Sequence, residues 1–227
     1  MKKLFVFDWN GTLLNDSDVN LLGFNETLKI FGVTPVSMDH YRETMDFPLV
    51  HMYTRNGIHV DDYLARFQEA TDTFFEHYRP AAKACALKEG TVELLEFLTD
   101  QGYDLMILSN QNDMDLRDQI AERHITQYFK IISGNYDNSV TGYTMTNKLQ
   151  RLEKILADHS YDLSQSYIIG DSLEEPEIAH RLGMNAISVT WGCFSRGRLE
   201  KTTTDHIIDD LAEVSNILQK SDVKEAV

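Results

Sequence analysis

Short apolar runs that alternate with amphipathic helical patterns most constrain the fold of this chain. The runs have the length and composition of strands buried on both faces, and they cover residues 4–7, 105–108, 129–132, 167–169 and 186–189, with a weaker sixth at 207–208. Helical patterns cover 92–98, 149–156 and 178–182. Strands that alternate with helices form parallel sheets with right-handed crossovers. The sequence therefore predicts a doubly wound, Rossmann-like α/β core with helices on both faces of the sheet.

The segment from residue 16 to residue 85 breaks this alternation, because it shows helical periodicity and no convincing strand. Its clearest feature is an apolar stripe at helical spacing, expected to end at Pro80 and formed by Tyr63, Phe67, Ala70, Phe74 and Tyr78. We infer that residues 16–85 form a separate helical domain inserted after the first strand. Residues 1–15 and 86–227 then make up the α/β core.

The charge and cysteine content exclude several classes of protein. A net charge of −15 over 227 residues, with no basic cluster, argues against a nucleic-acid binder. A small anionic substrate stays open, because one lysine or a metal can reverse the field inside a cleft. Two distant cysteines and an N-terminal apolar stretch too short to span a membrane favour a cytoplasmic protein without a membrane partner. The sequence leaves monomer and homodimer open.

Polar side chains follow three of the predicted strands at the point where each strand ends. Asp8 follows the first run, Ser109 and Asn110 follow the second, and Asp171 follows the run at 167–169. In open parallel sheets, ligands bind beyond the carboxyl ends of the strands, so these side chains should converge in one crevice. A single aspartate after a strand is more often a turn former or a helix cap. Together, however, they predict a Mg²⁺ site, since Mg²⁺ binds carboxylate oxygens.

The same residues carry a resemblance to a known family. Four short motifs occur in order, namely FDWNGT at 7–12, ILSN at 107–110, a lysine in TNKLQRLEKIL at 146–156, and IGDSLEEPE at 169–177. In this order they resemble the motifs of the haloacid dehalogenase-like hydrolases. The inserted helical segment lies where members of the phosphoglycolate phosphatase-like branch carry a helical cap. The resemblance covers almost all of the chain outside that segment, and it implies a phosphatase.

The resemblance implies a role for each matching residue. Asp8 would be the nucleophile that forms an aspartyl-phosphate. Mg²⁺ would be held by Asp8, by the main-chain carbonyl of Asn10 and by Asp171, with Glu175 acting as the second acid of the fourth motif through an indirect contact.

The remaining matching residues would contact the phosphoryl group. Ser109 and Asn110 would hydrogen-bond its oxygens. Lys148 would neutralise charge on both the nucleophile and the phosphoryl group.

Asn10 departs from the pattern, because phosphatases of this family usually have an aspartate there as general acid and base. General acid-base catalysis typically contributes about 10²- to 10⁴-fold in rate, so the change matters. Three explanations are open. The substrate has a leaving group that needs no proton, as in an acyl phosphate; or another group supplies the proton, for which the candidates are His51, Tyr53 and His59. In the third, catalysis has been lost. His51 and Arg55 are also candidate specificity residues of the cap, although exposed polar faces of a helical domain explain them equally well.

The sequence thus predicts a Mg²⁺-dependent phosphohydrolase that acts on a small phosphorylated metabolite, with a preference for good leaving groups because of Asn10. One alternative is a catalytically weak, phosphate-binding or regulatory protein that keeps the hydrolase fold. A second is a phosphonate hydrolase that cleaves a carbon–phosphorus bond. That reaction would use a cap lysine, and the only lysines of this segment, Lys29 and Lys83, lie near its ends.

Overall fold

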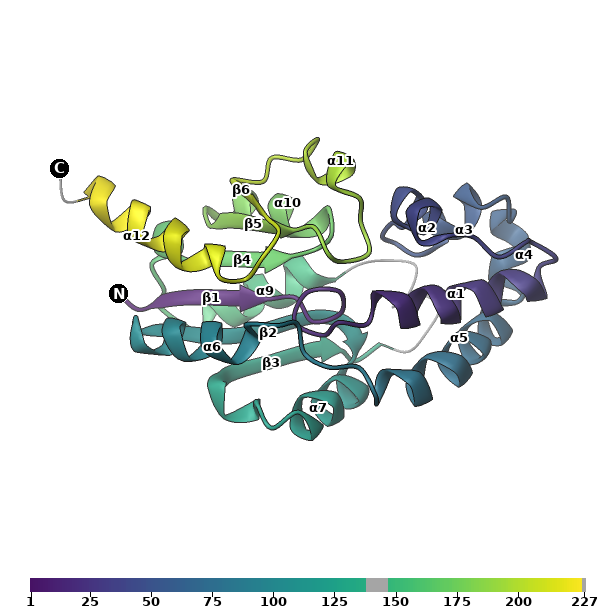
Figure 1. Cartoon of the computed structure of the whole chain (residues 1–227), viewed down its shortest axis with the longest axis horizontal. Helices are drawn as coiled ribbons and strands as arrows, with labels where there is room; N and C mark the ends of the chain where they lie inside the picture. The colour runs from purple at the N-terminus through teal and green to yellow at the C-terminus, as the bar shows by residue number, and fades with distance from the viewer. Residues whose placement is uncertain (138–146, 226–227) are drawn as a thin grey trace.

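The computed structural model describes residues 1–137 and 147–225. The described residues form one six-stranded parallel sheet in the order β3-β2-β1-β4-β5-β6, with helices on both faces (Figure 1). The strands are β1 (Lys3–Phe7), β2 (Tyr103–Asn112), β3 (Phe129–Asn135), β4 (Tyr167–Gly170), β5 (Asn185–Val189) and β6 (His206–Ile208). The prediction of a doubly wound parallel α/β core is confirmed.

The helices of the core follow the strands in alternation. They are α6 (Thr91–Asp100), α7 (Asp113–Glu122), α9 (Lys148–Ala157), α10 (Glu174–Leu182), α11 (Arg196–Leu199) and α12 (Glu213–Glu225), with short 3₁₀ turns η1 (Thr126–Tyr128) and η2 (Leu163–Gln165). In the described part of the chain, none of the helices combines the length and apolar character needed to cross a membrane.

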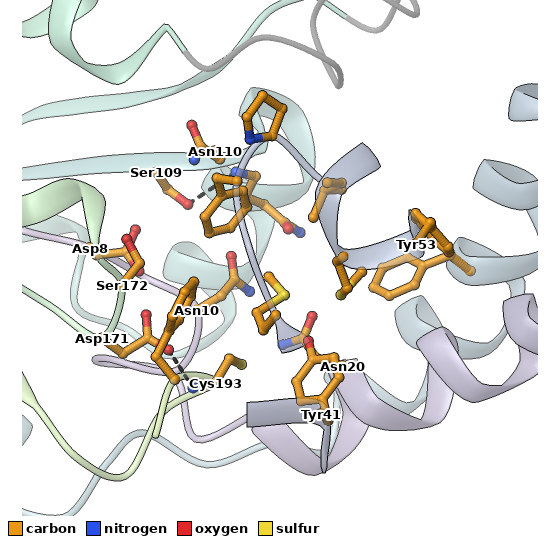
Figure 2. Close-up of a pocket in the computed structure, with 18 of the residues that line it drawn as sticks. Asp8, Asn10, Asn20, Tyr41, Tyr53, Ser109, Asn110, Asp171, Ser172 and Cys193 are labelled. Atoms are coloured by element: carbon orange, nitrogen blue, oxygen red, sulfur yellow. Dashed lines mark hydrogen bonds between the residues drawn. The ribbon is translucent and has the colours of Figure 1, made fainter. Parts of the chain in front are cut away.

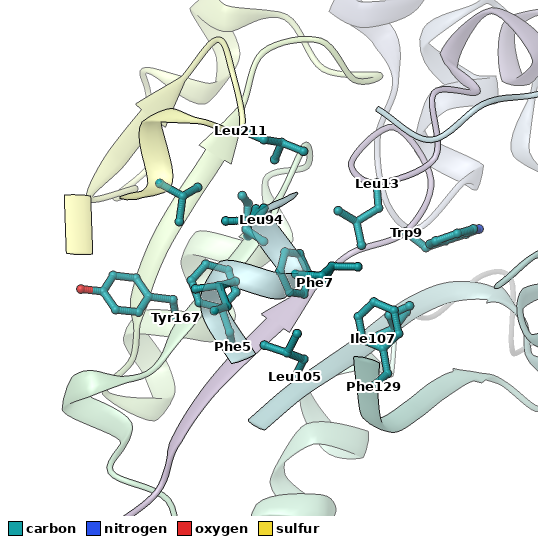
Figure 3. Close-up of a cluster of buried hydrophobic side chains, with 14 of the residues drawn as sticks. Phe5, Phe7, Trp9, Leu13, Leu94, Leu105, Ile107, Phe129, Tyr167 and Leu211 are labelled. Atoms are coloured by element: carbon teal, nitrogen blue, oxygen red, sulfur yellow. The ribbon is translucent and has the colours of Figure 1, made fainter. Parts of the chain in front are cut away.

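Alternate residues of β1 face opposite sides of the sheet, as the pleat of a strand requires. Phe5 and Phe7 lie in a buried cluster with side chains of α6, α7 and α12, part of which Figure 3 shows. Leu4 and Val6 lie in a second cluster with side chains of α9 and α10. Burial on both faces explains why this strand reads as an unbroken apolar run in the sequence.

Five helices and no strand lie between β1 and α6. They are α1 (Ser17–Ile30), α2 (Met38–Thr44), α3 (Val50–Arg55), α4 (Val60–Ala65) and α5 (Phe67–Ala82), together called the helical segment below. The segment has its own buried cluster, in which the rings of Tyr53 and Tyr63 stack with centroids 4.3 Å apart. The division into domains at residues 15/16 and 85/86 stays a prediction.

The expected helix end at Pro80 is wrong, since α5 continues to Ala82. Pro80 cannot donate a hydrogen bond to the carbonyl of Glu76 and crowds that carbonyl, and α5 ends only two residues later. The apolar stripe is also divided, because Tyr63 belongs to α4 and Phe67 begins α5.

The two chain crossings between the core and the helical segment run side by side. The main-chain N–H of Asn15 donates to Ala86 O at 3.1 Å, and that of Lys88 donates to Leu13 O at 2.8 Å. Figure 1 shows β1 pointing towards the helical segment, so these crossings leave the sheet at its carboxyl edge. Chain order reverses there between the neighbouring strands β1 and β4, which is where open α/β sheets bind ligands.

Truncation of Leu95 in α6 tests the packing of the core. This side chain is 0% exposed, whereas Val92 on the same helix is 36% exposed. We expect Leu95→Ala to lower the free energy of unfolding by about 2–5 kcal/mol, because it leaves a cavity beneath the sheet. Val92→Ala, as the control, should change it by less than about 0.5 kcal/mol. Urea unfolding of both variants gives the comparison, and equal effects would contradict the packing described here.

Candidate active site

Asp8 leaves the end of β1 directly beside the end of β4. Its main-chain N–H donates to Ile169 O at 2.9 Å, two residues before Asp171. The carboxylate is only 7% exposed, yet it lines a pocket of about 150 Å³ between the carboxyl edge of the sheet and the helical segment. Burial raises the pKa of Asp8 to about 6, and the nearby Lys148 limits the rise.

Lys148 is the first residue of α9 and lies between two carboxylates. Its Nζ donates to Asp8 Oδ1 and to Glu175 Oε1, both at 2.6 Å, and the side chain is 3% exposed. Burial disfavours its charged form, but the two carboxylates outweigh this effect and hold the pKa of Lys148 above its ordinary value. The ammonium ion is therefore fixed against the predicted nucleophile.

Glu175 faces this lysine and not the open pocket. Its Oε1 accepts from Lys148, while its Oε2 accepts from Ser172 Oγ at 2.5 Å and from Ser172 N at 3.1 Å. Burial opposes ionisation of Glu175, but the charge and hydrogen bond of Lys148 hold its pKa below the ordinary value. The structure gives Glu175 a contact that positions Lys148.

Asp171 lies close to the backbone of the loop that follows β1. Its Oδ2 accepts from Cys193 N at 2.5 Å, and a Cβ on Gly11 would come within 2.5 Å of the same oxygen. Gly11 also has φ +68°, so only glycine allows this approach without strain. Burial, together with the negative charge of Asp8, raises the pKa of Asp171 well above its ordinary value.

The donor set fits Mg²⁺. Asp8 and Asp171 place two buried carboxylates in one crevice, and the negative charge of Asp8 raises the cost of ionising Asp171. In the described residues, no three His, Cys, Asp or Glu side chains are grouped as a metal site. Mg²⁺ does not require three, because it commonly binds one or two carboxylates and completes its shell with water and substrate phosphate.

Ser109 and Asn110 lie in the last part of β2, which extends beyond the predicted end at Leu108. Figure 2 shows both on the same side of the pocket as Asp8, and Ser109 is buried. The Ser109 hydroxyl accepts from Gln111 N at 3.1 Å, and the Asn110 amide donates to Glu174 Oε2 at 2.8 Å. The pocket thus brings both residues together with Asp8, Asn10, Lys148 and Asp171.

The Asn10 amide is held by two partners from outside the motif. Its Nδ2 donates to Asp16 Oδ2 at 2.7 Å and to Tyr78 Oη at 2.8 Å. Tyr78 in turn donates to Asp16 Oδ2 at 2.7 Å, and Gly11 N donates to Asp16 Oδ1 at 2.8 Å. Asp16 is fully buried, which raises its pKa. Asn10 therefore connects the loop after β1 to both ends of the helical segment.

The cap candidates from the sequence do not all reach the pocket. Tyr53 lines it, whereas His51, Arg55 and His59 are not among its lining residues. Arg55 is exposed, and its Nη2 forms an ion pair with Asp46 at 2.5 Å.

Three residues of the site escaped the sequence analysis. Two of them are Asp16 and Tyr78, which are hydrogen-bonded to each other but lie 62 positions apart in the sequence. No local sequence pattern therefore predicts their contact. The third is Arg151, whose guanidinium donates to Ser109 O at 2.7 Å and Gly134 O at 2.8 Å and so fixes the strand ends. Its position one helical turn after Lys148 is a signal that could have found it.

The family model for haloacid dehalogenase-like hydrolases matches residues 5–189, which span β1 to β5, and the chain belongs to this family. The predicted family is thereby confirmed. Each of the four motifs lies at the carboxyl edge of the sheet or on a helix that begins there.

Known relatives extend over nearly the whole chain. A probable phosphatase, IndB, of Dickeya dadantii is 24% identical over 94% of this chain and 92% of its own. A phosphoglycolate phosphatase of Pseudomonas fluorescens is 24% identical over 94% of this chain and 79% of its own. The solved structure of a hydrolase from Streptococcus pneumoniae, a haloacid dehalogenase-like family protein, aligns with a TM-score of 0.76, with 24% identity over 95% of this chain and 98% of that chain. The prediction of an enzyme of the phosphatase class agrees with these relatives.

Substitution of Asn10 by aspartate tests the contact with Asp16. At pH 7, without added metal, Asn10→Asp would place two carboxylates at a hydrogen-bond distance and remove a buried donor. We expect the free energy of unfolding to fall by about 1–3 kcal/mol. The double variant Asn10→Asp/Asp16→Asn restores one amide opposite one carboxylate and should recover most of that loss. Urea unfolding checks this, and equal stability of the single and double variants would contradict the contact.

Proposed function

We propose that the chain is a Mg²⁺-dependent phosphohydrolase that acts on a small phosphorylated metabolite through an aspartyl-phosphate. The observation that carries the proposal is the buried Asp8 carboxylate. It is paired with the Lys148 ammonium at 2.6 Å, lies in one crevice with Asp171, and lines a pocket sized for a small molecule. The names of the relatives, which include phosphatases, support the same reaction class.

In this mechanism a carboxylate oxygen of Asp8 attacks phosphorus as the bond to the leaving oxygen breaks. Water then hydrolyses the aspartyl-phosphate and releases phosphate. Ser109 and Asn110 would hydrogen-bond the phosphoryl oxygens, and Lys148 would offset their charge. Mg²⁺, held by Asp8, Asp171 and the main-chain carbonyl of Asn10, would neutralise charge on the phosphoryl group when bound.

The contacts of Asn10 favour a substrate with a good leaving group. Both hydrogens of its amide are engaged by Asp16 and Tyr78, and an amide exchanges no proton. A leaving anion that is stable by itself departs without a general acid, as an acyl phosphate does. Among the candidates for a substitute proton donor, Tyr53 lines the pocket, but burial raises the pKa of its hydroxyl and makes it a poor acid.

A cytoplasmic location is part of the proposal. Cys85 and Cys193 are free thiols, and reduced cysteines are typical of that compartment.

Turnover of acetyl phosphate tests the reaction class. We expect the wild type to hydrolyse it with Mg²⁺ and to lose activity in EDTA. Asp8→Asn should lower kcat by at least about 10³-fold, because it removes the nucleophile. Wild-type turnover equal to that of Asp8→Asn would instead favour the phosphate-binding alternative.

Alkyl phosphates test the role of Asn10. The variant Asn10→Asp/Asp16→Asn supplies a carboxyl group without a second buried carboxylate. It should raise kcat/KM for an alkyl phosphate by about 10²- to 10⁴-fold while turnover of acetyl phosphate changes little. No gain on the alkyl ester would contradict a leaving-group filter.

Glu175→Gln tests the contact that positions Lys148. We expect kcat for acetyl phosphate to fall about 10- to 100-fold with little change in KM, because the variant weakens the orientation of the ammonium ion. Glu177→Gln, on the exposed face of the same helix, is the matched control and should leave kcat unchanged. A parallel rise in KM for Glu175→Gln would indicate a direct role in substrate binding.

A further inference from the structure

The pocket has two unlike halves. Its floor is polar and carries Asp8, Lys148 and Asp171 at the edge of the sheet. Its opposite wall comes from the helical segment and consists mostly of aromatic and other apolar side chains, with Phe194 added from the core, and includes Tyr41, Met45, Phe47, Met52, Tyr53 and Phe74. Figure 2 shows Tyr41 and Tyr53 across the cavity from Asp8 and Ser109.

The described side chains of the apolar wall include no cation. Among the described residues that line the pocket, Lys148 is the sole lysine, arginine or histidine, and it is already paired with Asp8 and Glu175. The sequence between the two described ranges, NSVTGYTMT at residues 138–146, also lacks these residue types. A substrate in this pocket therefore meets one cationic side chain, and that side chain lies at the phosphoryl end.

Basic residues of the helical segment are used in other contacts. Arg42 Nε donates to Gly192 O at 2.9 Å, Arg55 pairs with Asp46 at 2.5 Å, and Arg66 pairs with Glu69 at 2.8 Å. Arg79 pairs with Asp115 at 2.9 Å. Arg198, from the core, lies over the Phe194 ring and donates to the main-chain oxygens of Arg42 and Met45. None of these guanidinium groups lines the pocket.

This lining discriminates against a substrate with a second negative charge. The carboxylate of phosphoglycolate would meet no cation at this wall, only neutral donors at its rim such as the amides of Asn20 and Gln111, and burial of a charge without an ion pair is unfavourable. An apolar group in the same place gains free energy from leaving water. Phosphoglycolate, which appears in the name of one of the relatives, therefore does not suit this pocket as a substrate.

Resting on the proposed function, we infer that the substrate joins its phosphate to an uncharged, apolar group such as an aromatic ring. Tyr41, Tyr53 and Phe74 supply the faces against which a ring packs. A phenol-type leaving group, with a pKa of about 10, also leaves more readily than an alkoxide, which agrees with the amide at Asn10.

Benzyl phosphate and phosphoglycolate form the test pair, because both are phosphate esters of primary alcohols. Benzyl phosphate carries an aromatic ring where phosphoglycolate carries a carboxylate. We expect Asp8→Asn to bind benzyl phosphate at least about tenfold more tightly than phosphoglycolate, with Kd measured by calorimetry in the presence of Mg²⁺. On the wild type, kcat/KM should likewise be higher for benzyl phosphate than for phosphoglycolate. Equal or tighter binding of phosphoglycolate would overturn the inference.

A cation placed in the wall gives a second readout. Thr71 of α5 is half-buried and lines the pocket, whereas Thr73, two residues on, is half-buried and does not. In the Asp8→Asn background, Thr71→Arg should tighten phosphoglycolate binding at least about tenfold relative to benzyl phosphate. Thr73→Arg should leave the ratio within about twofold. A similar shift in both variants would show that overall charge, and not the wall, decides the preference.

The two proposals fail in different ways. Wild-type turnover of acetyl phosphate, together with tighter binding of phosphoglycolate, would retain the phosphohydrolase and reject the substrate class. Loss of all turnover, with benzyl phosphate still bound more tightly, would reject the phosphohydrolase and leave the ligand preference of the pocket standing.

Discussion

The arrangement at the edge of the sheet depends on one buried ammonium ion. Lys148 contacts Asp8 and Glu175 at 2.6 Å each, and Asp171 lies in the same crevice, so a single cation faces three buried carboxylates. Without it, these acids would have to take up protons or stay out of the interior. One turn further along α9, Arg151 binds main-chain oxygens of β2 and β3. Helix α9 thus offsets part of the negative charge of the site and fixes its strand ends.

The helical segment adds a surface of opposite character to this charged floor. Its buried cluster contains Phe24, Tyr41 and Tyr53 and is continuous with Cys193 and Phe194 of the core. Because the polar floor and most of the apolar wall come from different parts of the chain, the proposed reaction and the proposed choice of substrate would depend on different residues. Members of one fold family can therefore keep the chemistry and change the substrate through the inserted helices alone.

The sequence predicts the core well because its signals are local. An apolar run such as Leu4–Phe7 can be buried on both faces only inside a parallel sheet, and the side chain after it, Asp8, must then reach the carboxyl edge. The pocket wall was not predictable in this way, since helical periodicity does not tell which face of a helix meets another part of the chain. His51 and Tyr53 lie two residues apart on α3, and only Tyr53 lines the pocket. The orientation of Glu175 likewise depends on Lys148, 27 positions away.

The contact between Asn10 and Asp16 has a consequence for how this chain can change by mutation. A single nucleotide separates the codons of asparagine and aspartate, so one mutation at position 10 would place a second carboxyl group beside Asp8. That step sets one carboxylate against another in a buried place that also holds Tyr78 and the N–H of Gly11. The reverse change at position 16 alone gives two amides that compete for the same donors and acceptors. Each substitution is therefore unfavourable without the other. This dependence opposes the replacement of Asn10 by the aspartate that is usual in the family.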